Sequence, residues 1–323
     1  MIPQIVLAPL AGGPSTPELA AAVANAGGLG FVAGGYLEPD AFAERLARAR
    51  ELTDRPLGAN LFVVEEPAID ADAVAAYADE LAREGLELGE PRFDDDALAA
   101  KTEVALASDV DVISTTFGPP PRALVLDAHA AGKSVWATVS TVADAELALD
   151  RRVDVLVLQG IEAGGHRSAY DDADTTDLPL LELVRAVRAL TDAPLVAAGG
   201  IGDRSDVEAA LAAGADAVQC GTAFLLCPEA ATSDVHRDAI RRGGETALTR
   251  AFTGRRARGI VNAFMREHPD APSAYPQLHH LTAPMRAAAR ATGDAERVNL
   301  WAGTALAKAR EAPAAEIVAS LRA

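Results

Sequence analysis

Short apolar runs alternate along the chain with longer amphipathic stretches that are rich in alanine. The runs are continuously hydrophobic and do not alternate with polar residues, which is typical of parallel strands covered on both faces. This pattern predicts eight strands, at residues 5–8, 30–33, 57–62, 111–115, 134–138, 153–158, 195–198 and 217–220. Because amphipathic stretches separate these strands, the chain predicts an α/β fold with crossover helices.

Capping residues mark the beginning of several predicted helices. Thr16-Pro17 places a hydroxyl cap before a proline in the first turn, and Gly27 can end that helix. Asp203 begins another helix, which ends at Gly214. The three consecutive prolines at 119–121 predict one more helix start.

Eight strands joined by helices predict a TIM (β/α)8 barrel, and an open doubly wound sheet is the alternative. Small or polar residues follow nearly every strand, as in the strand-end loops that build barrel active sites, and this favours the barrel. The open sheet also lacks a dinucleotide fingerprint, because Ser205 stands where a third glycine should follow Gly200 and Gly202.

The barrel is predicted to carry an insertion. Residues 226–300 follow the eighth strand with a helical pattern and no strand signal, so we expect a mainly helical lid over the barrel mouth. The barrel itself would comprise residues 1–225 and 301–323, with a last helix over 302–321. The long segment 65–106 predicts two helices joined around the acidic stretch 85–96.

Composition excludes several classes of protein. The net charge of -18 over 323 residues argues against nucleic acid and anionic membrane partners, because the long-range field repels both. Two cysteines cannot form a disulfide framework. No apolar run approaches a membrane span and no basic leader begins the chain, so we expect a cytoplasmic enzyme without a membrane partner.

Two glycine-rich loops predict a phosphate-bearing ligand. They follow the seventh and eighth strands, where barrel enzymes commonly bind phosphate through backbone N–H groups and a helix N-terminus. The alternative is that these glycines only permit tight turns, and two such loops on adjacent strands favour the ligand. The candidate residues are Gly199, Gly200, Gly202, Gln219, Cys220, Gly221 and Thr222. Cys220 also suits a small core position.

A second candidate segment follows the sixth strand. Gln159 can hydrogen-bond a heteroaromatic ring, Gly164 and Gly165 permit close backbone approach, and His166 follows them on a loop at the barrel mouth. His166 could act as a base or donate a hydrogen bond to an anion. Asn60, at the end of the third strand, suits ring contacts or an ordinary turn cap.

No metal site is predicted, because no His, Cys and carboxylate cluster has ligand spacing. The adjacent pair His279 and His280 is expected in solvent or at an interface. The acidic residues Asp94, Asp95 and Asp96 are expected at a solvated helix start.

These residues occur in motifs that resemble the flavin-dependent nitronate monooxygenases, formerly called 2-nitropropane dioxygenases, over nearly the whole chain. The motifs are Ala8-Pro9-Leu10-Ala11-Gly12-Gly13, Ala26-Gly27-Gly28-Leu29-Gly30, Gly58-Ala59-Asn60-Leu61-Phe62, Gln159-Gly160-Ile161-Glu162-Ala163-Gly164-Gly165-His166, Ala198-Gly199-Gly200-Ile201-Gly202 and Gln219-Cys220-Gly221-Thr222. The motif that ends in His166 is specific for this superfamily. One departure is that Thr304-Ala305-Leu306 follows Trp301-Ala302-Gly303, where relatives carry Gln-Gly-Tyr.

The resemblance implies FMN at the barrel mouth, with its phosphate on the loops at 199–202 and 219–222. Asn60, Gln159 and Gly164 match cofactor-contacting positions, and the loop with Pro9, Leu10 and Ala11 would pass close to the isoalloxazine ring. His166 matches the active-site histidine. The implied reaction is the oxidation of alkyl nitronates, such as propionate 3-nitronate, by oxygen to a carbonyl compound and nitrite.

Three alternatives remain open on the same scaffold. They are an NAD(P)H:quinone reductase, a flavin enoyl-acyl-carrier-protein reductase and a non-enzymatic flavin-binding sensor. The net charge of -18 argues modestly against docking an acidic carrier protein. We expect a small-molecule substrate, and the chain could form a homodimer.

Overall fold

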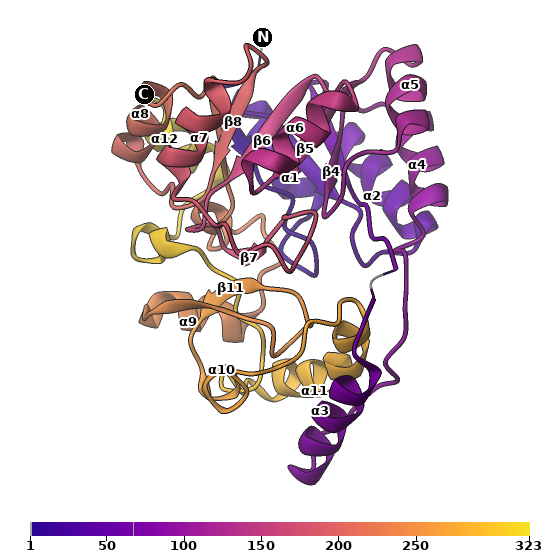
Figure 1. Ribbon diagram of the computed structural model, residues 1–323. Helices are drawn as coiled ribbons and strands as arrows, with labels where there is room; N and C mark the ends of the chain where they lie inside the picture. Colours follow the sequence, from indigo (N-terminus) through magenta and orange to yellow (C-terminus); the bar gives the residue numbers. More distant parts are fainter. Residues whose placement is uncertain (1, 67) are drawn as a thin grey trace.

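The computed structural model describes residues 2–66 and 68–323 and confirms the predicted barrel (Figure 1). Eight parallel strands form one sheet in the order β1-β9-β8-β6-β5-β4-β3-β2, and a bridge between Val6 and Leu29 joins its two ends. The barrel strands are β1 (Ile5–Leu7), β2 (Gly30–Ala33), β3 (Leu57–Phe62), β4 (Val112–Thr116), β5 (Ser134–Val139), β6 (Val155–Gln159), β8 (Leu195–Ala198) and β9 (Ala217–Cys220). All eight predicted strands are therefore present.

Apolar side chains hold the barrel together on both faces of the sheet. Inside the cylinder, Phe31 and Trp136 pack at a ring distance of 5.6 Å beside Val157 and Val196. On the outside, the strands pack against the helices through a larger core. Because side chains fill the cylinder, a ligand can bind only at the ends of the strands.

Helices surround the sheet, and several begin where the capping residues predict. They are α1 (Pro17–Asn25), α2 (Pro39–Leu52), α4 (Leu98–Ala107), α5 (Arg122–Ala130), α6 (Val142–Asp150), α7 (Leu180–Arg188), α8 (Arg204–Ala212) and α12 (Ala314–Leu321). The Thr16 hydroxyl caps α1 by accepting the Leu19 N–H at 2.9 Å. Asp203 and Asp206 form a reciprocal capping box at the start of α8.

A second body, which we call the lid body, covers one end of the barrel (Figure 1). It contains α3 (Ala71–Arg83), α9 (Asp234–Arg242), β10 (Thr246–Thr249), β11 (Ala257–Ile260), α10 (Ala263–Glu267) and α11 (Gln277–Thr292). Helix α3 precedes the fourth barrel strand in sequence, but its Tyr77 and Leu81 pack with Phe252 and Leu278 of the lid body. Two helices in segment 65–106 were predicted correctly, and the structure divides them between the two bodies.

The prediction that residues 226–300 contain no strand is wrong. Strands β10 and β11 pair antiparallel, and β11 also pairs with the short strand β7 (Gly165–His166) of the barrel-mouth loop. Both lid strands are short, and β11 contains Arg258 and Gly259, so neither has the continuous apolar run used to predict strands. Pairing with β10 on one side and with the barrel loop on the other supplies the hydrogen bonds that make β11 a strand.

The predicted continuous helix over 302–321 is also wrong. A short 3-10 helix, η2 (Thr304–Lys308), is separated from α12 by a stretch that ends at Pro313, the N-cap of α12. Proline disfavours helical backbone in the residue before it, so the helix starts only after this position. None of the helices in the described ranges combines the length and apolar character needed to cross a membrane.

Candidate active site

A cavity of about 610 Å³ lies where the barrel mouth meets the lid body. Its wall includes strand-end residues of the barrel, the loop that contains His166, and side chains of α9 and α11. This volume falls within the range of small-molecule and cofactor sites. The predicted residues that line it are Pro9, Leu10, Ala11, Asn60, Gln159, Gly164, Gly165, His166, Gly199, Gly200, Gln219, Cys220, Gly221 and Thr222.

Gly202 is the predicted site residue that the structure places outside the cavity wall. Its N–H donates to Asp206 Oδ2 at 2.9 Å, as part of the cap of α8, and its Cα faces the side chain of Lys308. Gly202 is therefore needed for helix capping and close packing. The sequence motif could not separate this role from ligand binding.

The two glycine-rich loops present unpaired backbone donors. The N–H groups of Gly200, Ile201, Gly221 and Thr222 have no protein acceptor among the described residues. Gly200 has a φ of +69°, a backbone conformation that L side chains rarely adopt. Adjacent free N–H groups at the end of two parallel strands form an anion-binding arrangement.

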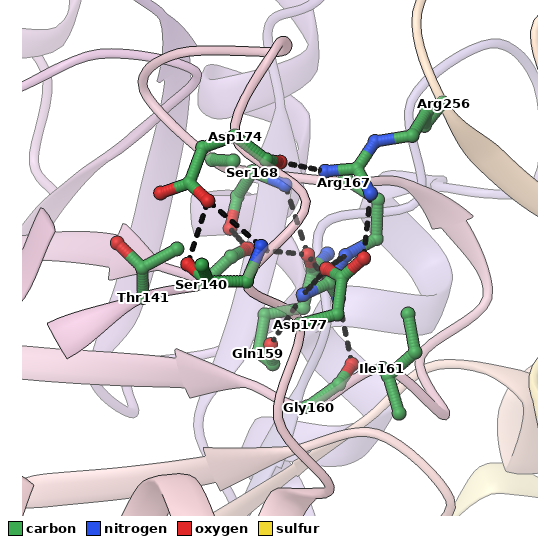
Figure 2. Close-up of polar contacts among 12 residues, drawn as sticks. Ser140, Thr141, Gln159, Gly160, Ile161, Arg167, Ser168, Asp174, Asp177 and Arg256 are labelled. Carbon is green, nitrogen blue, oxygen red and sulfur yellow. Dashed lines mark hydrogen bonds and ion pairs between the residues drawn. The ribbon is translucent and has the colours of Figure 1, made fainter.

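Gln159 is held by a buried polar network (Figure 2). Its Oε1 accepts hydrogen bonds from the Ser140 hydroxyl, from Arg167 Nη1 and from the Ser168 N–H, at 2.9–3.0 Å. Its Nε2 donates to the carbonyl oxygen of His166 at 2.9 Å. Because the carbonyl oxygen of this amide is occupied, Gln159 positions the His166 loop and has one N–H left for a ligand.

Asn60 has the opposite arrangement. Its Nδ2 donates to Ser114 Oγ at 2.9 Å and to Thr116 Oγ1 at 3.1 Å. Its Oδ1 is buried and has no hydrogen-bond partner among the described residues. An unpaired buried acceptor is costly, and a ligand that donates a hydrogen bond here would satisfy it.

Gly164 lines the cavity but is required for packing within the protein. A Cβ at this position would lie 2.4 Å from the backbone nitrogen of Gly303. Gly165 has a φ of +78° with open space around its missing side chain. The two glycines thus bring the His166 loop against residues 302–303 and turn it toward β11.

His166 lies in an aromatic cage at the meeting point of the two bodies. Its ring centroid lies 5.8 Å from that of Phe117, 5.7 Å from Tyr275 and 5.4 Å from Trp301. Burial lowers the pKa of His166 to about 3, and the charges of Arg255 and Arg286 lower it further in the same direction. The imidazole is therefore neutral near pH 7.

Thr253 is the hydrogen-bonding neighbour of the His166 ring. Its hydroxyl oxygen lies 2.9 Å from His166 Nε2 and 3.3 Å from the carbonyl oxygen of Arg255. In the tautomer with the proton on Nε2, the ring donates to Thr253, the Thr253 hydroxyl donates to Arg255, and Nδ1 carries the lone pair. No hydrogen-bond partner of Nδ1 lies in the described ranges, so this lone pair is available as a base.

Comparison with known proteins assigns the chain to a family. The family model for nitronate monooxygenase matches residues 1–323. The chain is 38% identical over 332 residues to a nitronate monooxygenase from Pseudomonas aeruginosa, covering 98% of this chain and 94% of the relative. A probable nitronate monooxygenase from Bacillus subtilis is 37% identical over 308 residues, covering 93% and 89%. The chain belongs to the nitronate monooxygenase family.

Solved structures agree with this assignment. A nitroalkane oxidase from Streptomyces ansochromogenes superposes with a TM-score of 0.93 at 44% identity, covering 98% of this chain and 94% of that one. FabK from Thermotoga maritima superposes with a TM-score of 0.78 at 25% identity, covering 98% and 91%. The protein is thus an oxidoreductase with the nitronate monooxygenase fold.

The departure from the family motif lies at the cavity wall. Thr304, Ala305 and Leu306 belong to η2, and Ala305 lines the cavity. The Gly303 N–H donates to Thr222 Oγ1 at 2.9 Å, and the Thr304 N–H donates to the Glu162 carbonyl oxygen at 3.0 Å. Backbone N–H groups of this segment therefore connect the glycine-rich loop at 219–222 to the loop that contains His166.

Sequence reasoning missed several residues of the lid body that line this nitronate monooxygenase cavity. The prediction for His279 is wrong, because its ring stacks on that of Tyr36 at 4.3 Å and faces the cavity. Arg286 lies on the same helix and also lines the cavity. The spacing of seven residues between them, two turns of one helix, was the available signal. Trp301, in contrast, belongs to the segment Trp301-Ala302-Gly303, which resembles the family sequence.

One further prediction needs correction. Asp96 is not solvated: it accepts a hydrogen bond from the Tyr36 N–H at 2.8 Å and pairs with the buried ammonium of Lys101 at 2.8 Å. The fold also brings His268 to Glu80 and Glu84, which lie one helical turn apart, so that one ligand atom of each residue lies within 4.8 Å of the others. The two carboxylates face opposite nitrogens of the His268 ring, at 2.9 and 3.4 Å, and thus join α3 to the rest of the lid body.

Cys220 lines the cavity but is not a nucleophile. Burial raises the pKa of its thiol to about 12. A thiol that stays protonated near pH 7 is a weak nucleophile, so Cys220 contributes shape to the cavity wall.

Proposed function

We propose that the protein oxidises alkyl nitronates, such as propionate 3-nitronate, with oxygen to a carbonyl compound and nitrite, using FMN. The observation that carries this proposal is the neutral His166, with a free Nδ1, in a single cavity with two adjacent loops whose backbone N–H groups are free to bind a phosphate. The family assignment supports nitronate oxidation in general, and the cavity supports the finer statement. The expected setting is the cytoplasm.

The cavity fits FMN on three counts. The free N–H groups of Gly200, Ile201, Gly221 and Thr222 suit a phosphate. The unpaired Asn60 Oδ1 suits a ring N–H donor. The volume of about 610 Å³ leaves room for a small substrate beside the ring. When bound, FMN would supply the electron-transfer chemistry that no side chain of this cavity provides.

The protein groups perform orientation and proton transfer. In the tautomer whose Nε2–H donates to the Thr253 hydroxyl, His166 Nδ1 carries the lone pair and can remove the α-proton of a neutral nitroalkane. A substrate that arrives as the nitronate needs no proton removal. Phe117, Tyr275 and Trp301 surround the imidazole and exclude water, which keeps it neutral.

Anaerobic reduction separates the proposed activity from its alternatives. We expect propionate 3-nitronate to bleach the flavin absorbance of the purified protein in a stopped-flow spectrometer, and NADH and NADPH to leave it unchanged. Rapid bleaching by a reduced nicotinamide would instead identify a quinone or enoyl reductase. A flavoprotein that neither class of donor reduces would be a sensor.

A second prediction concerns the glycine-rich loop after β8. Gly200→Asp should retain roughly tenfold less FMN than Gly200→Asn, because a carboxylate beside the phosphate adds like-charge repulsion. Both variants place a side chain of the same size at a φ of +69°, so the asparagine variant isolates the effect of charge. FMN released by heat is quantified by absorbance against protein concentration. Equal flavin content in the two variants would place the phosphate elsewhere.

A further inference from the structure

Arg286 is a buried guanidinium that faces the cavity without a carboxylate partner. It lies on α11, its residue is 8% exposed, and it forms no ion pair within the described ranges. Its Nε donates to Thr282 Oγ1 at 3.0 Å, and its Nη2 donates to the carbonyl oxygen of His279 at 2.7 Å. Nη1 has no protein acceptor in the part of the chain that the structure describes. A buried charge is costly unless an opposite charge pairs with it, so a bound anion would stabilise this guanidinium.

The neighbours of Arg286 fix its position. His279 Nδ1 accepts a hydrogen bond from Arg286 Nη2 at 3.3 Å. The His279 ring also stacks on the Tyr36 ring, with an angle of 5° between the planes. Tyr36 is in turn held by Asp96, which binds its backbone N–H. Arg286 is therefore a pre-organised donor, and binding an anion would cost it little side-chain entropy.

The charge of the cavity wall points in the same direction. Although the protein has a net charge of -18, no aspartate or glutamate among the described residues lines the cavity. The histidines at the wall do not supply positive charge, because burial lowers the pKa of His166 to about 3 and that of His236 to about 4. Arg290, one turn after Arg286, is exposed and lies at the rim. Arg286 thus carries the fixed positive charge inside the cavity.

We propose that Arg286 is the anion receptor of this site and binds an anionic oxygen of the substrate through the two N–H groups of Nη1. Nitronate and carboxylate groups both present such an oxygen, and a charge-assisted hydrogen bond from a guanidinium is stronger than one between neutral groups. The inference rests on the proposed function for the identity of the substrate, and it separates two tasks. Arg286 selects the charged substrate, while the neutral His166 remains free to act as a base.

Binding of nitrate, a planar anion that does not react, tests the receptor without reference to turnover. Nitrate is titrated by calorimetry into the purified wild-type protein, Arg286→Gln, Arg286→Lys and Arg266→Gln. The last variant removes an exposed positive charge from α10 of the lid body and is the matched control. We expect Arg286→Gln to weaken nitrate binding roughly ten- to a hundredfold, the range for a charge-assisted hydrogen bond, and Arg266→Gln to bind as the wild type does.

Kinetics with two substrates then show which anionic group is bound. If Arg286 holds the nitronate, Arg286→Gln raises KM for both ethylnitronate and propionate 3-nitronate. If it holds a remote carboxylate, only propionate 3-nitronate is affected. Either result supports the receptor.

The proposal would be overturned by wild-type nitrate affinity in Arg286→Gln, or by an unchanged KM for both anionic substrates. Thermal melting checks that each variant is folded. If the glutamine variant does not fold, Arg286→Lys decides, because it keeps the charge and loses the Nη1 donors: binding weakened severalfold supports the proposal, and unchanged binding rejects it. A wild-type protein that binds nitrate through Arg286 but oxidises no nitronate would refute the proposed function and leave the receptor standing.

Discussion

His166→Ala is expected to lower kcat/KM for nitroethane by about 10²–10⁴-fold, the usual contribution of a positioned acid–base group. The variant should keep its flavin, because the N–H groups assigned to the phosphate belong to other loops. The loss should be smaller for ethylnitronate, which needs no proton removal. Initial rates of oxygen consumption with the two substrates, together with the flavin content of the purified variant, measure these effects.

The pH dependence gives this prediction a second readout. Because burial lowers the pKa of His166 to about 3, Nδ1 keeps its lone pair at every pH above that value, and protonation switches the base off only below it. We therefore expect kcat/KM for nitroethane to show no loss from this group between pH 5 and 9. His129→Ala, which removes a half-exposed histidine on α5, is the control and should behave as the wild type. Unchanged nitroethane kinetics in His166→Ala would remove the imidazole from the mechanism.

The barrel was predictable from the sequence because each of its strands has a local signature. A strand covered on both faces is a continuous apolar run. The capping residues of α1 and α8, in turn, accept hydrogen bonds from backbone N–H groups in the first turn of the same helix. The lid strands lack this signature, and β11 pairs both with its neighbour β10 and with Gly165 and His166 from a distant part of the chain. Periodicity reports on local environment and does not reveal a partner strand.

The residues of the candidate site also differ in how far the sequence alone could predict them. Residues on strand-end loops of the barrel were predictable, because position in a barrel already implies proximity to the mouth. His279 and Arg286 lie on a lid helix, and only the packing of α11 across the cavity brings them to the barrel residues. Gln159 and Gly164 line the cavity, but the sequence could not define their contacts within the protein, which are with Arg167 and Gly303.

The largest expected effect on stability concerns Asp177, a carboxylate that serves two buried guanidiniums (Figure 2). Its Oδ1 accepts from Arg167 Nε at 3.1 Å, and its Oδ2 accepts from Arg256 Nη1 at 2.5 Å. The side chains of Arg167 and Arg256 are 0% and 8% exposed. Removing one partner of a buried ion pair typically costs about 3–5 kcal/mol, because the remaining charge stays buried without compensation.

Asp177→Ala should therefore lower the melting temperature by roughly 5–15 °C. Asp150→Ala is the matched control, because it breaks an ion pair with Arg122 in which both side chains are more than half exposed, and such a pair contributes little. Equal shifts in the two variants would show that the network of Figure 2 does not hold the loop in place. The loss should also reach the site: Arg167 donates to Gln159, and Gln159 holds the carbonyl oxygen of His166, so kcat/KM should fall along with stability. Asp177 is thus expected to couple the stability of the fold to the position of the base.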